Sequence, residues 1–79
     1  MFAFINDNKV EIFYNSTIKD LITSYSLNQL NLILAKDLIV IDSDGDIVDI
    51  NGSIDEGDSF YIIENKKHNL NKTWKISNH

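Results

Sequence analysis

The sequence predicts an α+β fold in which a mixed sheet of four to five strands packs against one main helix. Three observations support this prediction. The chain opens with two short strand-like runs separated by a turn. A capped amphipathic helix start, Ser16–Ile22, follows directly, and Ser59–Glu64 has the aromatic and β-branched content of a strand. Elements in this order indicate a two-layer domain with the helix on one face of the sheet.

The first two strands are predicted to form a hairpin. Phe2–Ile5 is a short apolar run with aromatic and β-branched residues, and Val10–Tyr14 has similar content. Asn6–Lys9, between them, has the composition of a turn, because Asn and Asp tolerate a left-handed backbone and cap their own turns.

The main helix is predicted to run from about Thr17 to Tyr25. Thr17 can accept a hydrogen bond from an amide of the first turn, and Asp20 places negative charge near the positive end of the helix dipole. The apolar residues that follow recur on one helix face. The expected core consists of Ile18, Leu21, Ile22, Val10, Ile12, Phe60 and Ile62.

The segment after the helix is predicted to contain short extended elements. Leu27–Asn31 is expected to be a connector and Leu32–Ala35 a short buried strand. Two alternatives follow: Lys36-Asp37 forms a tight turn, or Leu38–Ile41 continues the extended segment.

The strongest turn signal lies at Asp44-Gly45. This dipeptide favours a two-residue hairpin loop, in which both central positions need positive φ, so Ile47–Ile50 is the expected return strand. Further turns are predicted at Asn51-Gly52 and at Glu56–Asp58. The order of all these elements is that of a β-grasp fold.

A single domain is expected over residues 1–64, with a polar tail at 65–79. The tail holds four lysines and four asparagines, so it is expected to be solvated and disordered unless Trp74 docks it on the domain.

Composition excludes several classes of function. The chain has no cysteine, and its two histidines, His68 and His79, lie in the tail, so no catalytic, cofactor or metal site is expected. The net charge is −5 without a basic stripe, which disfavours direct nucleic-acid binding and fits either a basic protein partner or solubility alone. No apolar run reaches the roughly 18 residues that span a membrane. Met1–Ile5 lacks the features of a signal peptide, so a cytoplasmic location is expected. A non-enzymatic role is expected because the residues of each catalytic template are incomplete and a domain of this size has few walls for a catalytic pocket.

The alternating carboxylates Asp42, Asp44 and Asp46 resemble half of a calcium-binding loop. An EF-hand loop also needs glycine at its sixth position and glutamate at its twelfth, where this chain has Ile47 and Ser53. A solvated hairpin turn is therefore the expected structure.

Alternation along the strands predicts a binding surface. If one side of each strand faces the helix, large apolar side chains remain on the other face of the sheet, which a two-layer fold leaves uncovered. The candidate partner-binding residues are Phe13, Tyr61, Ile63, Ile5 and Glu11, with Ala3 on the same face. The alternative is that the tail covers this face through Trp74.

Three segments together resemble the sulfur-carrier branch of the ubiquitin-like β-grasp proteins, the type found in thiamine biosynthesis and as the small subunit of molybdopterin synthase. They are Asn6–Ile12, Ser16–Ile22 and Ile54–Ile63. The resemblance implies an activating enzyme or a synthase subunit as partner. Members of this family end in Gly-Gly shortly after the last strand, where a thiocarboxylate forms. This chain instead continues through Asn65 to His79 without glycine.

Three functions remain open at this point. The first is a non-enzymatic interaction module, either a degenerate relative of the sulfur carriers or a regulator, which binds a protein or itself through the exposed sheet face. The second is a sulfur carrier with a diverged or processed C-terminus. The third is a small acidic inhibitor that occupies the basic groove of a nucleic-acid-binding protein.

Overall fold

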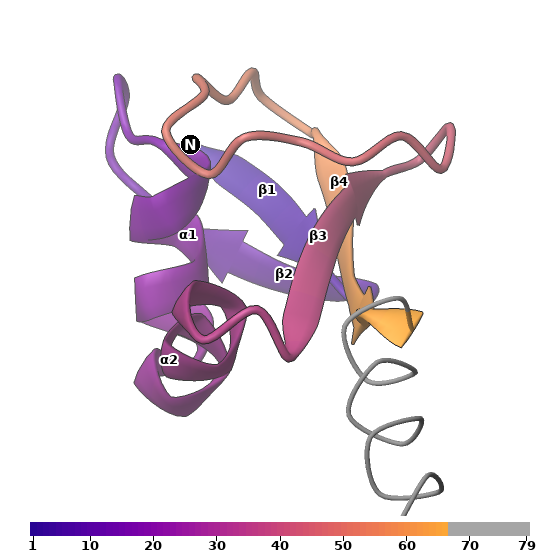
Figure 1. The fold of residues 1–79 in the computed structure, drawn as a ribbon. Helices are drawn as coiled ribbons and strands as arrows, with labels where there is room; N and C mark the ends of the chain where they lie inside the picture. Colours follow the sequence, from indigo (N-terminus) through magenta and orange to yellow (C-terminus); the bar gives the residue numbers. More distant parts are fainter. Residues whose placement is uncertain (67–79) are drawn as a thin grey trace, which may run out of the picture.

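A computed structural model of the chain describes residues 1–66 (Figure 1). The elements are β1 (Phe2–Ile5), β2 (Asn8–Glu11), α1 (Ile18–Tyr25), α2 (Leu27–Leu34), β3 (Leu38–Asp42) and β4 (Ser59–Glu64). The four strands form one mixed sheet in the order β2-β1-β4-β3, in which β1 and β4 are parallel and the outer pairs antiparallel. The predicted α+β class and mixed sheet are confirmed, and the strand order is compatible with a β-grasp.

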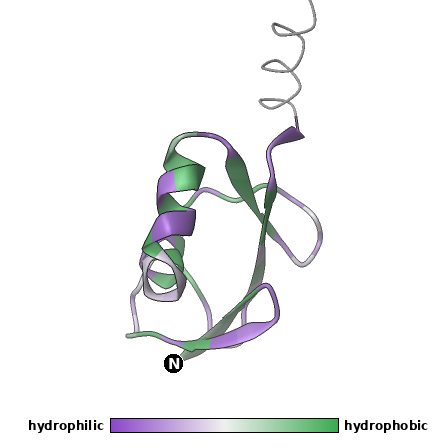
Figure 2. Ribbon diagram, turned by 90° about the horizontal axis from the view of Figure 1, so that it is seen from below, coloured by the Kyte–Doolittle hydropathy of each residue, from purple (hydrophilic) through white to green (hydrophobic). Residues whose placement is uncertain are grey.

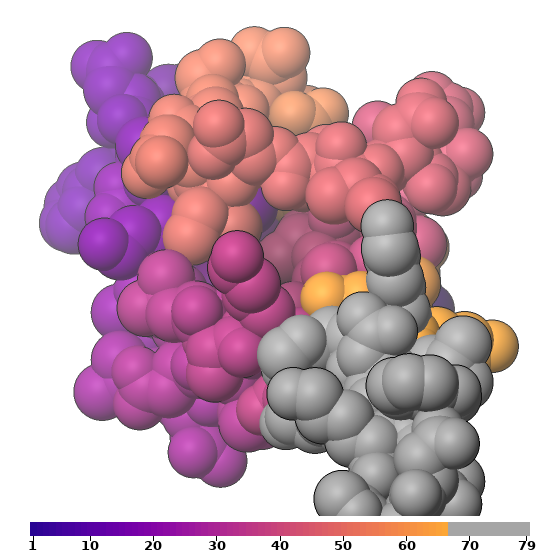
Figure 3. All heavy atoms as spheres, in the orientation of Figure 1, coloured from indigo at the N-terminus to yellow at the C-terminus, as the bar shows by residue number. Residues whose placement is uncertain are grey.

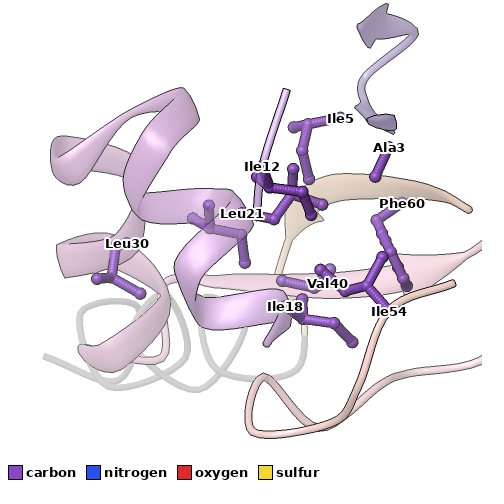
Figure 4. Close-up of a cluster of buried hydrophobic side chains, with 10 residues drawn as sticks. Ala3, Ile5, Ile12, Ile18, Leu21, Leu30, Val40, Ile54 and Phe60 are labelled. Atoms are coloured by element: carbon purple, nitrogen blue, oxygen red, sulfur yellow. The ribbon is translucent and has the colours of Figure 1, made fainter. Parts of the chain in front are cut away.

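Both helices lie on one side of the sheet (Figure 2). The first helix, α1, contacts β1 and β2, and α2 contacts β3. Ten buried side chains fill the space between the two layers (Figure 4). Each helix has eight residues, and in the part of the chain that is described no helix is long and apolar enough to cross a bilayer.

The predicted hairpin is confirmed, with a shifted second strand. Asn6 and Asp7 both have positive φ, 50° and 67°, as a two-residue turn of type I′ requires. The chain therefore returns at once, and β2 begins at Asn8 instead of the expected Val10. It ends at Glu11, and beyond it Ile12 exchanges two backbone hydrogen bonds with Met1.

The predicted helix is confirmed as α1. Thr17 Oγ1 accepts a hydrogen bond from the Asp20 amide at 3.2 Å, and Asp20 Oδ2 accepts one from the Thr17 amide at 3.0 Å. This reciprocal pair is a capping box, which satisfies two amides at the helix start. The buried residues of α1 are Ile18, Leu21 and Ile22.

The expected connector and strand at residues 27–35 are wrong, because this segment forms the second helix, α2. Ser26 both ends α1 and caps α2: its amide donates to the Ile22 carbonyl at 2.7 Å, and its hydroxyl accepts from the Gln29 amide at 3.2 Å. The apolar run favours a buried strand when only its composition is considered. In the structure, however, the residues that contact the core are Leu30, which is buried, and Ile33, and their spacing of three residues is that of one helical turn. Lys36, at φ 68°, follows the helix and turns the chain into β3.

The predicted core is largely confirmed. Of the seven expected residues, five are buried, and Val10 and Ile62 are half-buried and pack against them. The expectation that Ala3 and Ile5 lie on the uncovered face is wrong, since both are 0% exposed. The register explains the error: Ala3 pairs with Val10 and Ile5 with Phe60, and paired residues point to the same side of a sheet.

The expected return strand at Ile47–Ile50 is also absent. Ile47 forms only an isolated bridge with Ile41, and the Val48 amide donates to the Val40 carbonyl at 3.0 Å. Gly45 has a positive φ of 87°, whereas Asp44 does not share the left-handed backbone that a type I′ turn needs. The chain then crosses one end of the molecule to β4 (Figure 3).

The last strand, β4, matches its prediction of Ser59–Glu64. The predicted tail begins at residue 65, and Trp74 lies outside the described residues.

Asn6 extends the pairing between the hairpin and β4. Its amide donates to the Phe60 carbonyl at 3.0 Å, and its side-chain Oδ1 accepts from the Ile62 amide at 2.9 Å. The side chain thus continues the parallel ladder by one bond after β1 has ended.

Two substitutions at Asn6 should separate the two roles of this residue. Asn6→Gly keeps the positive φ and loses the side-chain bond, so we expect it to cost about 0.5–1.5 kcal/mol. Asn6→Ala also forces a left-handed backbone on a residue with a Cβ and should cost roughly 1–2 kcal/mol more. Urea unfolding of both variants measures the difference. Equal losses would contradict the strained-turn explanation.

Candidate binding surface

The face of the sheet opposite the helices is the main candidate site. On each strand, the residues next to the buried positions point to this side. We call the apolar ones the open face: Phe2, Phe4, Ile39, Ile41, Tyr61 and Ile63. Lys9 and Glu11 occupy the same side on β2.

The open face is apolar across three neighbouring strands. Phe2 is 36% exposed and Ile63 is 41% exposed, while the remaining four side chains are half-buried. Ile39 stands opposite Ile63, and Ile41 stands opposite Tyr61, so the apolar pairs adjoin along β3 and β4. Contiguous apolar surface of this kind is typical of a protein contact rather than of a solvated sheet face.

Hydrogen bonds to the hairpin turn hold the centre of this face in place. The Tyr61 hydroxyl donates to Asp7 Oδ1 at 2.9 Å. This bond and the negative charge of Asp7 stabilise the protonated phenol, so they raise the pKa of Tyr61 above its usual value of about 10. Tyr61 is therefore a fixed, neutral aromatic side chain in the middle of the open face.

The raised pKa of Tyr61 predicts how stability depends on alkaline pH. The folded state holds the phenolic proton more tightly than the unfolded state, so this stabilisation is complete below pH ~10 and disappears as the pH rises through the folded-state pKa. We expect the free energy of unfolding to fall more steeply above pH ~10 in the native protein than in Tyr61→Phe. Urea unfolding across this range measures it.

Asp7→Asn provides the matched variant, because Asn also tolerates the positive φ of this turn position. It should return the pKa of Tyr61 towards its usual value, as read from tyrosinate absorbance. An unchanged titration in Asp7→Asn would show that Asp7 does not cause the shift.

Charged groups border the open face at the Phe2 end. Lys9 Nζ lies 4.0 Å from the centre of the Phe2 ring, a cation–π contact. Glu11 stands opposite Phe2 on β2, and Glu56 Oε2 accepts a hydrogen bond from the Phe2 amide at 2.6 Å. Asp7, at the hairpin turn, adds a third carboxylate beside Tyr61.

The wider charge distribution is uneven along the chain. All twelve acidic residues and four of the seven lysines lie within 1–66, which gives this part a formal charge of −8. Residues 67–79 contain three lysines and no acidic residue. The described domain is thus more acidic than the chain as a whole, whose net charge is −5.

The structure brings together three of the five residues that the sequence analysis singled out. Tyr61, Ile63 and Glu11 lie on the uncovered side of the sheet. Ile5 does not, because it is fully buried in the core. Phe13 is 89% exposed, but it follows the end of β2 and does not belong to the open face.

Sequence reasoning missed Phe2, Phe4, Ile39 and Ile41. The available signal was alternation in β1 and β3, but both strands are apolar on both sides. Only the strand register decides which residues face the helices.

Phe13 instead borders a shallow groove between the β2–α1 connection and α1. The groove has a volume of about 600 Å³, and Met1, Ile12 and Tyr14 also line it. The connection is held by the Ser16 hydroxyl, which donates to the Phe13 carbonyl at 2.6 Å. Glu11 also lines this groove, so the groove adjoins the open face at the end of β2.

The three carboxylates Asp42, Asp44 and Asp46 lie in one turn, and the carboxylate of Asp42 accepts hydrogen bonds from backbone amides of the same turn. Asp42 Oδ1 accepts hydrogen bonds from the amides of Asp44 and Asp46 at 2.9 and 3.0 Å. Across residues 1–66, no group of three or more potential ligand side chains is arranged to hold a metal ion.

Calcium is accordingly expected to leave the protein unchanged. Adding it to millimolar concentration should not alter the melting temperature, because these carboxylates do not complete the shell of six to eight oxygens that Ca²⁺ takes. Thermal unfolding with magnesium as the control checks this. A rise with calcium and not with magnesium would establish a calcium site.

No family model, curated protein or solved structure matches this chain. The candidate surface is therefore assigned from its own geometry and chemistry.

Proposed function

We propose that this chain is a non-enzymatic β-grasp module that binds a protein partner through its open face. The observation that carries the proposal is the continuous apolar surface of Phe2, Phe4, Ile39, Ile41, Tyr61 and Ile63, on the side of the sheet that the helices leave uncovered. Exposed apolar surface costs free energy in a free monomer, and a partner that covers it recovers this energy.

The β-grasp assignment is supported by the strand order β2-β1-β4-β3 and by a parallel pair of the first and last strands at the centre of the sheet. The capped helix α1 lies between the opening hairpin and the remaining strands, as the β-grasp expectation requires. The resemblance to the sulfur carriers places an activating enzyme or a synthase subunit among the partners to be tested.

The surface also specifies the chemistry of the partner. Its centre would accept apolar and aromatic side chains, and the carboxylates of Asp7, Glu11 and Glu56 at the border would pair with lysine or arginine. The partner surface is therefore apolar at its centre and basic at its rim.

Site-specific photocrosslinking in the native host tests the proposal. A photoreactive amino acid at position 63 should crosslink one partner, whereas the same group at Leu34, which is 56% exposed on α2, should not. The crosslinked protein is then purified, and its affinity for the native chain is measured by calorimetry. Crosslinking of the same partner from both positions, or from position 34 only, would contradict the assignment to the open face.

A second candidate is the acidic inhibitor of a nucleic-acid-binding protein. One observation favours it: residues 42–58 hold seven carboxylates and no lysine. Here binding would depend on this segment and would weaken steeply with salt. Replacing Asp44, Asp46 and Asp49 by asparagine distinguishes the candidates, because the open-face proposal predicts little change in affinity.

A further inference from the structure

The chain leaves the sheet next to the open face. After β4, the Asn65 amide donates to the Asp37 carbonyl at 3.0 Å, and Asn65 Nδ2 donates to the Lys36 carbonyl at 2.9 Å. These two bonds fix residue 65 at the start of β3, beside the pair of Ile39 and Ile63. The segment that follows therefore begins at one end of the open face.

Residues 67–79 have the chemistry that this face would bind. They contain three lysines and no acidic residue, and three apolar side chains, Leu70, Trp74 and Ile76. The part of the chain before them has a formal charge of −8, and three of its carboxylates lie beside Phe2 and Tyr61 of the open face. Charge and apolar content are thus complementary between the two parts.

The length of this segment is sufficient. Thirteen extended residues reach at most about 45 Å, whereas six residues of strand, the length of β4, span only about 20 Å. The segment could therefore turn back and lie along the whole of β4.

We infer that residues 67–79 bind the open face of their own domain, with Trp74 as the apolar anchor, and that a protein partner must displace them. Only the displacement step rests on the proposed function. Attachment to the domain gives the segment an effective concentration on the order of 1 mM, so even a contact with a Kd of about 0.1 mM would keep the face covered most of the time. It would weaken the apparent affinity for a partner about tenfold.

Trp74 is the only tryptophan, so its fluorescence in the full chain tests this contact directly. We expect blue-shifted emission and weak acrylamide quenching in the native protein. Ile63→Ser should shift the emission to the red and increase quenching, and Ile39→Ser provides a second open-face variant. Leu34→Ser, on the exposed side of α2, should leave Trp74 unchanged. Salt near 1 M, where the Debye length is about 3 Å, should weaken the protection.

Three results would overturn the inference. The first is that Trp74 is fully accessible to acrylamide in the native protein. The second is that Trp74 is equally protected in Ile63→Ser and Leu34→Ser, which would mean that it does not contact the open face. Protection that increases with protein concentration would identify a second copy as the occupant. If position 63 still crosslinks a partner, these results contradict only the inference about residues 67–79, and the proposed function remains. If Trp74 is protected but no partner is crosslinked, only the proposed function is contradicted.

Discussion

Leu21→Ala is expected to lower the free energy of unfolding by about 2–5 kcal/mol. Leu21 is 0% exposed and belongs to the side of α1 that faces the sheet. Truncation removes buried methyl groups and leaves a cavity, because the capping box at Thr17 and Asp20 fixes the start of the helix and limits how far it can collapse onto the gap. A domain of this size is stabilised by only about 4–10 kcal/mol, so the loss is a large part of the total.

Urea and thermal unfolding measure this loss. The melting temperature should fall by about 10 °C or more, since each kcal/mol is worth roughly 4–8 °C in a small domain. Leu34→Ala is the matched control, because the same truncation at a residue that is 56% exposed should stay within about 0.5 kcal/mol. Equal effects of the two variants would mean that the buried face of α1 is misassigned.

The elements that could be predicted from the sequence are those with local signals. Thr17 and Asp20 make both bonds of a capping box within four residues of chain, so the start of α1 depends on nothing distant. The Asn6-Asp7 turn is local for the same reason, since both residue types tolerate the positive φ that it needs. Strand β4 is recognisable because four consecutive residues, Phe60–Ile63, have high β-propensity.

The second helix could not be predicted with the same rules. Its sequence, Leu27–Leu34, has apolar residues on several sides, and no periodicity separates a short helix from a buried strand in such a run. The deciding feature is Ser26, whose hydroxyl caps the new helix while its amide closes the old one. A serine between two apolar runs is too common a pattern to indicate this by itself.

The candidate site depends on long-range information. Which side of β1 faces the helices is set by its register with β2 and β4, and a shift of one residue would exchange Ala3 and Ile5 for Phe2 and Phe4. If the larger side chains of β1 were assumed to face the helices, Phe2 and Phe4 would be assigned to the core. The fold instead buries the smaller residues, which leaves the two rings on the open face.

Ile63→Glu is expected to weaken partner binding by at least about 100-fold, equivalent to about 2.7 kcal/mol. In a complex, this carboxylate would be desolvated among the apolar side chains of Ile39 and Tyr61 without a cation to pair with. The free protein should still fold, because Ile63 is 41% exposed and a glutamate there can point into water. Calorimetry with the crosslinked partner measures the affinity, and urea unfolding measures the stability.

Ile63 is a better position for this test than Tyr61. The Tyr61 hydroxyl donates to Asp7, so Tyr61→Glu would place two carboxylates together, and a loss of binding could not be separated from a loss of the hairpin contact. Leu34→Glu is the control, since it adds the same charge on the helical side and should leave the affinity within about twofold. If Ile63→Glu binds as tightly as Leu34→Glu, the contact surface does not include β4. If it unfolds the domain, Ile63 stabilises the fold itself, and its assignment to a contact surface is wrong.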